Sequence, residues 1–296
     1  MFKEKIGFKK PEKKGDVSFG DFSKEFLDLY SRVNRRPKTI ESHENSINHL
    51  KAFFKNCPLR EITPDQAARY IAERRAKVSA ASVNRELSCL KCMLNKAVEW
   101  GRLDMNPIAR VKKLKEPEAK DRTLSIAEVG RLIESAAPHL RPVLVLLLGT
   151  GLRKSEALSL EWKDVDLAKG FIYIGATESK GGHSRTVPMS VPVYEILHEL
   201  REHSKSDFVF ASKSGKNVTE IKRSFRTALK KAGIKGVTLH TLRHTFATQA
   251  VECGVDLRTL QELLGHRSIL MTQRYCHPRP EVKRRAVEKV SEALFQ

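Results

Sequence analysis

The 296-residue sequence predicts a mainly α-helical protein with one small β-ribbon, arranged in two domains. Apolar residues recur every three or four positions through most of the chain, which is typical of amphipathic helices. Two short strand-like runs, residues 171–174 and 185–187, flank a Lys-Gly-Gly stretch and predict a hairpin. Residues 106–122 are rich in Lys and Pro with few apolar anchors, so they predict a linker.

The first domain is expected to be a four-helix bundle over residues 17–105, preceded by a Lys-rich tail over residues 1–16. Pro37 can open the second helix, and Thr63 with Gln66 forms a capping box for the third. The fourth helix begins at Ser79 or Ser82. The apolar face expected of the first helix consists of Phe22, Phe26, Leu29, Tyr30 and Val33. The basic residues expected on the outer face of the bundle are Arg74, Arg75, Lys77, Arg85, Lys91 and Lys96.

The second domain is expected to span residues 123–296 and to carry the ribbon. Ser125 with Glu128 forms a capping box for its first helix, and residues 141–148 read as a buried helix. A helix over residues 256–264 would end at Gly265, which suits the left-handed position after a helix. Further helices are expected at residues 191–203, 218–231 and 281–295.

The charge of the chain indicates an anionic partner. Lys and Arg number 55 against 35 acidic residues, giving a net charge of +20 and a pI near 9.8. DNA or RNA is the leading partner, and a basic surface kept for solubility is the alternative. The longest apolar run, residues 143–148, is too short to cross a membrane, and the N-terminus lacks a secretory signal. Cys89 and Cys92 lie on a helical apolar pattern and are expected to be structural thiols in a reducing cytoplasm, without zinc.

The stretch from residue 238 to 277 carries the chemistry. An Arg at position 243 offers a planar fork for phosphate oxygens, and His240 and His266 can exchange protons near neutral pH. The hydroxyl of Tyr275 can form a phosphoester, and this set needs no metal. Each residue taken singly also fits a solvated helix face, a helix cap or a packing position. The combination favours a phosphate clamp with a nucleophile.

These residues resemble the motifs of the tyrosine recombinase (phage integrase) family and occur in the family's order. The matching stretches are Gly149-Thr150-Gly151-Leu152-Arg153-Lys154-Ser155-Glu156, Lys180-Gly181, residues 240–248 (HTLRHTFAT), Leu264-Gly265-His266 and Tyr275. The four-helix region with its linker is similar to the family's core-binding domain. The resemblance implies a mixed α/β catalytic domain that ends in a C-terminal helix.

The resemblance also implies DNA strand exchange through a covalent 3′-phosphotyrosyl intermediate and a 5′-hydroxyl, without cofactor, metal or ATP. Tyr275 would be the nucleophile, and Arg153 and Arg243 would hold the oxygens of the scissile phosphate. Lys180 would protonate the departing 5′-oxygen, and His240 would act as base or donor. Two further residues complete the expected site: His266 would bind the phosphate by a hydrogen bond, and Glu156 would support the pocket. Their neighbours His183, His244 and His277 are expected to be packing or surface residues.

The implied partner is a double-stranded DNA recombination site, bound by a homotetramer on two duplexes, with a second recombinase or a directionality factor as further partners. The expected location is the cytoplasm, on the nucleoid of a bacterium or archaeon. Two alternatives share parts of the pattern: a type IB topoisomerase-like relaxing enzyme and a catalytically silent DNA-binding regulator. DNA contacts are expected from Ser42, Asn45, Ser82, Arg85, Lys112 and Lys113.

Overall fold

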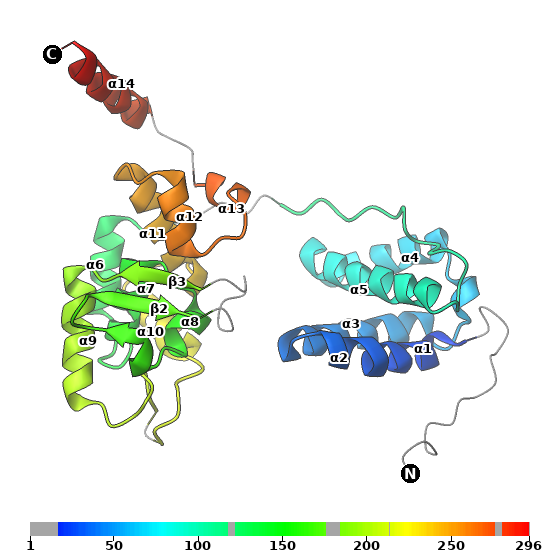
Figure 1. The fold of residues 1–296 in the computed structure, drawn as a ribbon. Coiled ribbons are helices and arrows are strands. Elements are labelled where there is room, and N and C mark those ends of the chain that lie inside the picture. Colours follow the sequence, from blue (N-terminus) through cyan, green and yellow to red (C-terminus); the bar gives the residue numbers. More distant parts are fainter. Residues whose placement is uncertain (1–16, 118–121, 176–183, 213, 276–279, 296) are drawn as a thin grey trace. The chain divides into compact units, whose positions relative to one another are not determined.

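The computed structural model describes residues 17–117, 122–175, 184–212, 214–275 and 280–295 (Figure 1). Its elements are mostly helices, with one three-stranded antiparallel sheet, so the predicted fold class is confirmed. The chain separates into two units, Met1–Ala119 and Lys120–Gln296. Across the described ranges, no helix is both long and apolar enough to span a membrane.

The first unit is a helical bundle. Its elements are α1 (Phe19–Phe26), a π-helical turn (Leu27–Ser31), α2 (Arg32–Asn34), α3 (Pro37–Phe54), a 3₁₀ turn (Leu59–Glu61), α4 (Pro64–Arg75) and α5 (Ala80–Glu99). The Thr63–Gln66 capping box is present, and Ser79 caps α5 by accepting from the backbone N–H of Ser82. The bundle closes around one apolar core that includes Phe22, Phe26, Ile47, Leu50, Tyr70, Leu87 and Leu90.

The first helix does not bury the face that its apolar spacing predicts. Leu29 and Val33 are 59% and 73% exposed, whereas Phe22 and Phe26 are fully buried. The cause is the π-helical turn, which inserts one residue into the helical repeat and moves the next inward position to Ser31. The Ser31 hydroxyl lies 2.6 Å from Nδ1 of His43, so a polar pair occupies the place expected for an apolar side chain.

Arg74 was expected on the outer face and instead lies half-buried against Glu86. Its Nη2 donates to Oε1 of Glu86 at 2.6 Å, and the hydroxyl of Tyr70 donates to the other oxygen at 2.6 Å. Burial alone would raise the pKa of Glu86, but the hydrogen bonds from Arg74 and Tyr70 hold it below its usual range. The charge of Arg74 is therefore paired with Glu86 inside the bundle and does not belong to its outer face.

The first half of the expected linker packs on the first unit. Ile108 is buried in the bundle core. The side-chain amide of Asn84 donates to the carbonyl of Leu114 at 2.9 Å and accepts from its N–H at 2.8 Å. Lys91 Nζ donates to the carbonyl of Val111 at 2.6 Å. Most of these contacts are hydrogen bonds to α5, and such bonds leave no apolar pattern in the sequence. The composition of the segment therefore predicted a free linker.

The second unit surrounds a small sheet with helices. Its strands, in the order β1-β2-β3, are β1 (Val165–Asp166), β2 (Phe171–Ile174) and β3 (Arg185–Pro188). Its helical elements are α6 (Ile126–Glu134), α7 (Arg141–Thr150), α8 (Lys154–Leu158), a 3₁₀ turn (Trp162–Asp164), α9 (Val191–His203), α10 (Lys222–Lys231), α11 (Leu239–Glu252), α12 (Leu257–Leu264), α13 (Leu270–Gln273) and α14 (Pro280–Leu294). The predicted Ser125–Glu128 capping box, the predicted ribbon pairing and the predicted span of α9 are confirmed.

Helix α7 is the central packing element of the second unit. It contacts α9 and α11, while α12 contacts both α11 and β3. Figure 1 shows α11 and α12 together beside α13 (orange) at one end of this unit. Helix α10 begins at Lys222, later than predicted, because Val218 instead donates a backbone hydrogen bond to Phe210. This packing brings four separated stretches together: the loop after α7, the strand β3, the start of α11 and the end of α12.

Candidate active site

Three arginine side chains meet at the C-terminal end of α12. Arg185 Nε, Arg243 Nη2 and Arg153 Nη2 donate to the successive carbonyls of residues 263, 264 and 265, at 2.9, 2.6 and 3.2 Å. These carbonyls have no partner further along the helix and carry the negative end of the helix dipole. The end of α12 therefore gathers cationic groups from β3, α11 and the N-cap of α8.

Glu156 lies fully buried below two of these arginines. Its carboxylate accepts from Arg153 Nη1 at 2.7 Å and from Arg185 Nη2 at 2.7 Å, and also from the backbone N–H of Arg153 at 2.9 Å. Burial alone would raise the pKa of Glu156, but hydrogen bonds and charge from Arg185, with further donors from Arg153, hold it below its usual range. Glu156 is thus an anion that fixes both guanidinium groups.

Arg243 is the most deeply buried of the three arginines, with 2% of its surface exposed. Its Nη1 donates to the carbonyl of Gly151 at 2.7 Å, at the turn that ends α7. Burial, and after it the charge of Arg153, lowers the pKa of Arg243 to about 9. The side chain stays cationic near neutral pH, and an anion bound beside it would be strongly favoured.

Tyr275 reaches the same region from the segment after α13. Only 8% of its surface is exposed, and its ring packs with Ala247, Leu260 and Leu264. Its hydroxyl lies 2.9 Å from Nδ1 of His244 on α11. The phenol is therefore held by an apolar wall on its ring and by an imidazole at its oxygen.

His266 follows Gly265, which adopts the predicted left-handed conformation with φ +63°. Its Nδ1 lies 2.9 Å from the hydroxyl of Thr272, and its ring is nearly parallel to that of Tyr275, with centroids 6.4 Å apart. Burial, then the charges of Arg243 and Arg153, lowers the pKa of His266 to about 4. The imidazole is therefore neutral at neutral pH and has a single N–H to donate.

The two histidines on α11 lie one helical turn apart. His240 is exposed, and its ring stands almost perpendicular to that of His244, with centroids 4.5 Å apart. His244 was expected to be a packing or surface residue and instead contacts the hydroxyl of Tyr275. His244 thus lies in contact with both the Tyr275 hydroxyl and the ring of His240. Lys180, together with His183 and His277, lies outside the described residues.

The residues expected to contact DNA from the first unit differ in exposure. Arg85, Asn45, Lys112 and Lys113 are exposed, whereas Ser42 and Ser82 are half-buried. Ser82 belongs to the start of α5, where its hydroxyl lies 3.1 Å from that of Ser79. Exposure on the bundle surface is a requirement for DNA contact, and four of the six residues meet it fully.

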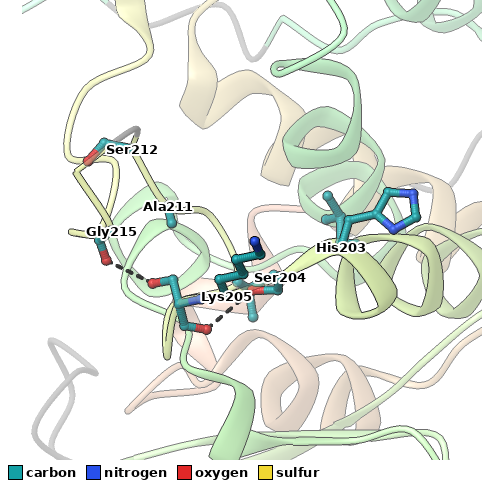
Figure 2. Close-up of a pocket in the computed structure, with 9 residues that line it drawn as sticks. His203, Ser204, Lys205, Ala211, Ser212 and Gly215 are labelled. Carbon is teal, nitrogen blue, oxygen red and sulfur yellow. Dashed lines mark hydrogen bonds between the residues drawn. The ribbon is translucent and has the colours of Figure 1, made fainter.

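A cavity of about 540 Å³ adjoins the arginine cluster. It is lined by Arg185, Thr186, Arg258, Gly265, His266 and Arg267, among others. A second cavity, of about 310 Å³, lies at the end of α9 around Ser204, Lys205 and Gly215, where Ser206 bonds the carbonyl of Gly215 (Figure 2). It shares no residue with the cluster. Among the residues that the structure describes, no group of His, Cys, Asp and Glu could hold a metal ion.

Arg185 and His244 are the functional candidates that sequence reasoning missed. A signal for each is visible once the elements are known. On β3, Arg185 lies two residues before the buried Val187, so it points to the inner face of the sheet, where a cation needs a buried partner. His244 follows His240 by four residues on one helix, which puts both rings on the same face.

Comparison with known proteins identifies the family. The phage integrase family matches residues 122–281, and the phage integrase SAM-like domain matches residues 18–114. The tyrosine recombinase XerA of Pyrococcus furiosus is 35% identical over 245 residues, covering 77% of this chain and 81% of that protein. The tyrosine recombinase XerD of Shewanella oneidensis is 31% identical over 274 residues, covering 84% of this chain and 89% of XerD.

Solved structures share the fold. The Tn1549 transposon integrase in complex with a circular intermediate DNA gives a TM-score of 0.79 at 20% identity, over 93% of this chain and 99% of that one. A lambda integrase dimer bound to a core site gives 0.78 at 21% identity, over 89% and 97%. These matches favour neither the topoisomerase-like alternative nor the silent regulator. The chain belongs to the phage integrase family and is a site-specific tyrosine recombinase.

Proposed function

We propose that this recombinase cuts DNA by attack of Tyr275 on one phosphodiester, leaving a 3′-phosphotyrosyl bond and a 5′-hydroxyl, and rejoins it by the reverse reaction. The observation that carries the proposal is the clustering of a buried tyrosine, a neutral histidine, the buried Arg243 and the half-buried Arg153 around the end of α12. One phosphoester replaces another, so the bond energy is retained and the reaction proceeds without ATP or metal.

The arginines Arg153 and Arg243 would bind the non-bridging oxygens of the phosphate. Negative charge grows on these oxygens as the tyrosine attacks, and donors fixed in place beforehand stabilise that charge without reorganising. Each arginine carries five N–H donors. The carbonyls of α12 and of Gly151 engage some of them and thereby orient the guanidinium planes, while the phosphate would take others.

Protons would move through three further side chains. Lys180 would protonate the departing 5′-oxygen, which is a poor leaving group as an alkoxide. His240 would act as base or donor beside the phosphate. His266 would donate from Nε2 to a phosphate oxygen, because the Thr272 hydroxyl can donate to its Nδ1 and leave the single proton on Nε2.

A nicked suicide substrate tests the nucleophile. We expect the wild-type protein to form a covalent adduct with DNA in the presence of EDTA, and Tyr275→Phe to form none, since it lacks the attacking oxygen. Tyr194→Phe, on the exposed face of α9, is the matched control and should form the adduct at the wild-type level. An adduct formed by Tyr275→Phe would refute the assignment.

We also propose a homotetramer on two DNA duplexes, with α14 docking on a neighbouring subunit. Helix α14 exposes apolar side chains at Val287, Val290 and Leu294, which are 70%, 58% and 70% exposed. Such a row on one helix is typical of a surface that binds a partner. A lambda integrase of the same fold forms a tetramer on a Holliday junction.

For DNA recognition we propose contacts from the first unit. The exposed side chains of Asn45 on α3 and Arg85 on α5 would contact bases, and Lys112 and Lys113 would contact phosphates. Ser42 and Ser82 are half-buried on the same two helices, and their hydroxyls would contact the DNA next to Asn45 and Arg85.

A further inference from the structure

We propose that His244 is a catalytic residue that accepts the phenolic proton of Tyr275 during cleavage and returns it during rejoining. The proposal rests on the proposed function, in which Tyr275 is the nucleophile. His240 was expected to act as base or donor. In this proposal His244 is the base that takes the proton of the attacking oxygen, and His240 is a donor beside the phosphate.

The geometry is that of a nucleophile paired with its base. The Tyr275 hydroxyl and His244 Nδ1 are 2.9 Å apart, within the range for proton transfer along a hydrogen bond. The ring of His266 is stacked beside the phenol ring, with centroids 6.4 Å apart. The oxygen that would attack is thus in hydrogen-bond contact with His244.

The surroundings fix both partners. The phenol ring is held against Leu260, Leu264 and Ala247, so its oxygen has little freedom to leave the imidazole. His244 is half-buried on α11, one turn after His240, whose perpendicular ring centroid is 4.5 Å away. His240 itself is exposed.

The protonation state follows from the chemistry of the pair. In the tautomer that carries the ring proton on Nε2, Nδ1 of His244 accepts the phenolic O–H, and this is the arrangement that the proposed step uses. A free tyrosine has a pKa of about 10, so near neutral pH it attacks well only when an acceptor takes its proton as the new bond forms. A neutral imidazole is the side chain best suited to that task.

The step balances in both directions. In cleavage, the Tyr275 oxygen bonds to phosphorus, the bond from phosphorus to the 5′-oxygen breaks, and the phenolic proton moves to Nδ1 of His244. The 5′-oxygen receives its proton from the acid, for which we propose Lys180. In rejoining, the 5′-hydroxyl attacks phosphorus and gives its proton back to the deprotonated acid, the bond from phosphorus to the tyrosine oxygen breaks, and His244 protonates that oxygen.

His244→Asn tests the proposal against a purely structural role. The Asn side-chain oxygen can take the place of Nδ1 and accept the same hydrogen bond, but it cannot hold a proton near neutral pH. We expect adduct formation on the nicked suicide substrate to slow by roughly 10²-fold to 10⁴-fold, the usual effect of losing a general base. His203→Asn, on the exposed end of α9, should leave the rate unchanged. A wild-type rate for His244→Asn would overturn the proposal.

A substrate with sulfur at the bridging 5′ position distinguishes protonation of the leaving group from deprotonation of the nucleophile. A thiolate leaves without a proton, so this substrate restores a variant that lacks the acid. We expect it to rescue Lys180→Ala and to leave His244→Asn slow. Full rescue of His244→Asn would mean that His244 serves the leaving group and would overturn the proposal.

Two further measurements show whether a slow rate in His244→Asn comes from misfolding or from weaker DNA binding. The thermal midpoint and the DNA affinity of His244→Asn should match the wild type, since the hydrogen bond to Tyr275 is kept. If they fall, His244→Gln, which places its amide near the position of Nε2, gives a second variant for the same comparison. Failure of the underlying function is distinguishable, because it appears as an adduct in Tyr275→Phe, whereas failure of this inference appears as activity in His244→Asn.

Discussion

Glu156 is the residue on which the arginine cluster depends most. It is a fully buried carboxylate shared by Arg153 and Arg185, and removing one partner of such a group leaves uncompensated buried charge. We expect Glu156→Gln to lower the free energy of unfolding by about 3–5 kcal/mol near neutral pH. Glu195→Gln, exposed on α9, should change it by less than about 0.5 kcal/mol. Urea denaturation measures both.

The effect of Glu156 should depend on pH in a defined direction. Because Arg185 and Arg153 hold the folded-state pKa of Glu156 below its usual range, its contribution is complete above the unfolded value of about 4.3. The contribution is lost as the pH falls through the folded-state pKa. The difference between wild type and Glu156→Gln should therefore narrow in acid, and a difference independent of pH would contradict this account.

At the level of single residues, the sequence proposed candidate site residues but not the side chains that contact them. Motif order singled out Arg153, Arg243 and Tyr275, because residue types that bind phosphate are rare in combination. It missed the contact of His244 with Tyr275 and the bond of Arg185 to Glu156, since both join segments that lie far apart in the chain. Such partners depend on packing, which a motif does not encode.

At the level of elements, the turn after α12 can be tested with a matched pair of glycines. Gly265 and Gly254 both have positive φ, +63° and +86°, so alanine is strained at either. A Cβ at Gly265 would lie 2.8 Å from Arg185 Nη1, whereas a Cβ at Gly254 meets nothing within 4 Å. We expect Gly265→Ala to slow adduct formation well beyond Gly254→Ala, because it displaces Arg185. Equal rates for the two variants would contradict this.

Local signals predicted elements reliably where the determinant is local. The capping boxes at Thr63 and Ser125 formed as predicted because each depends on a hydrogen bond between residues three apart. The π-helical turn that ends at Ser31 was not predictable from apolar spacing, which assumes an unbroken helical repeat. Lys180, on the predicted hairpin, lies outside the described residues and stays a prediction.

At the level of the whole molecule, α14 is the testable element of assembly. We expect Val290→Ser with Leu294→Ser to spare binding to a single DNA site and to reduce the formation of complexes between two sites, because an apolar contact between subunits is lost. Glu288→Gln with Glu292→Gln, on the exposed surface of the same helix, should leave both unchanged. Gel mobility with one and with two DNA sites measures the two steps. Normal pairing by the serine variant would contradict the proposed docking.

The arginines are anchored to main-chain oxygens of α12, and every amino acid supplies such an oxygen. Side chains along the exposed face of α12 can therefore drift through evolution while the anchors stay in place. Insertion or deletion of one residue is different, because it rotates the carbonyls by about 100° around the helix axis. The length of α12 is thus under tighter constraint than its composition, and substitutions on that face should leave the arginine anchors in place as long as the number of residues in the helix is kept.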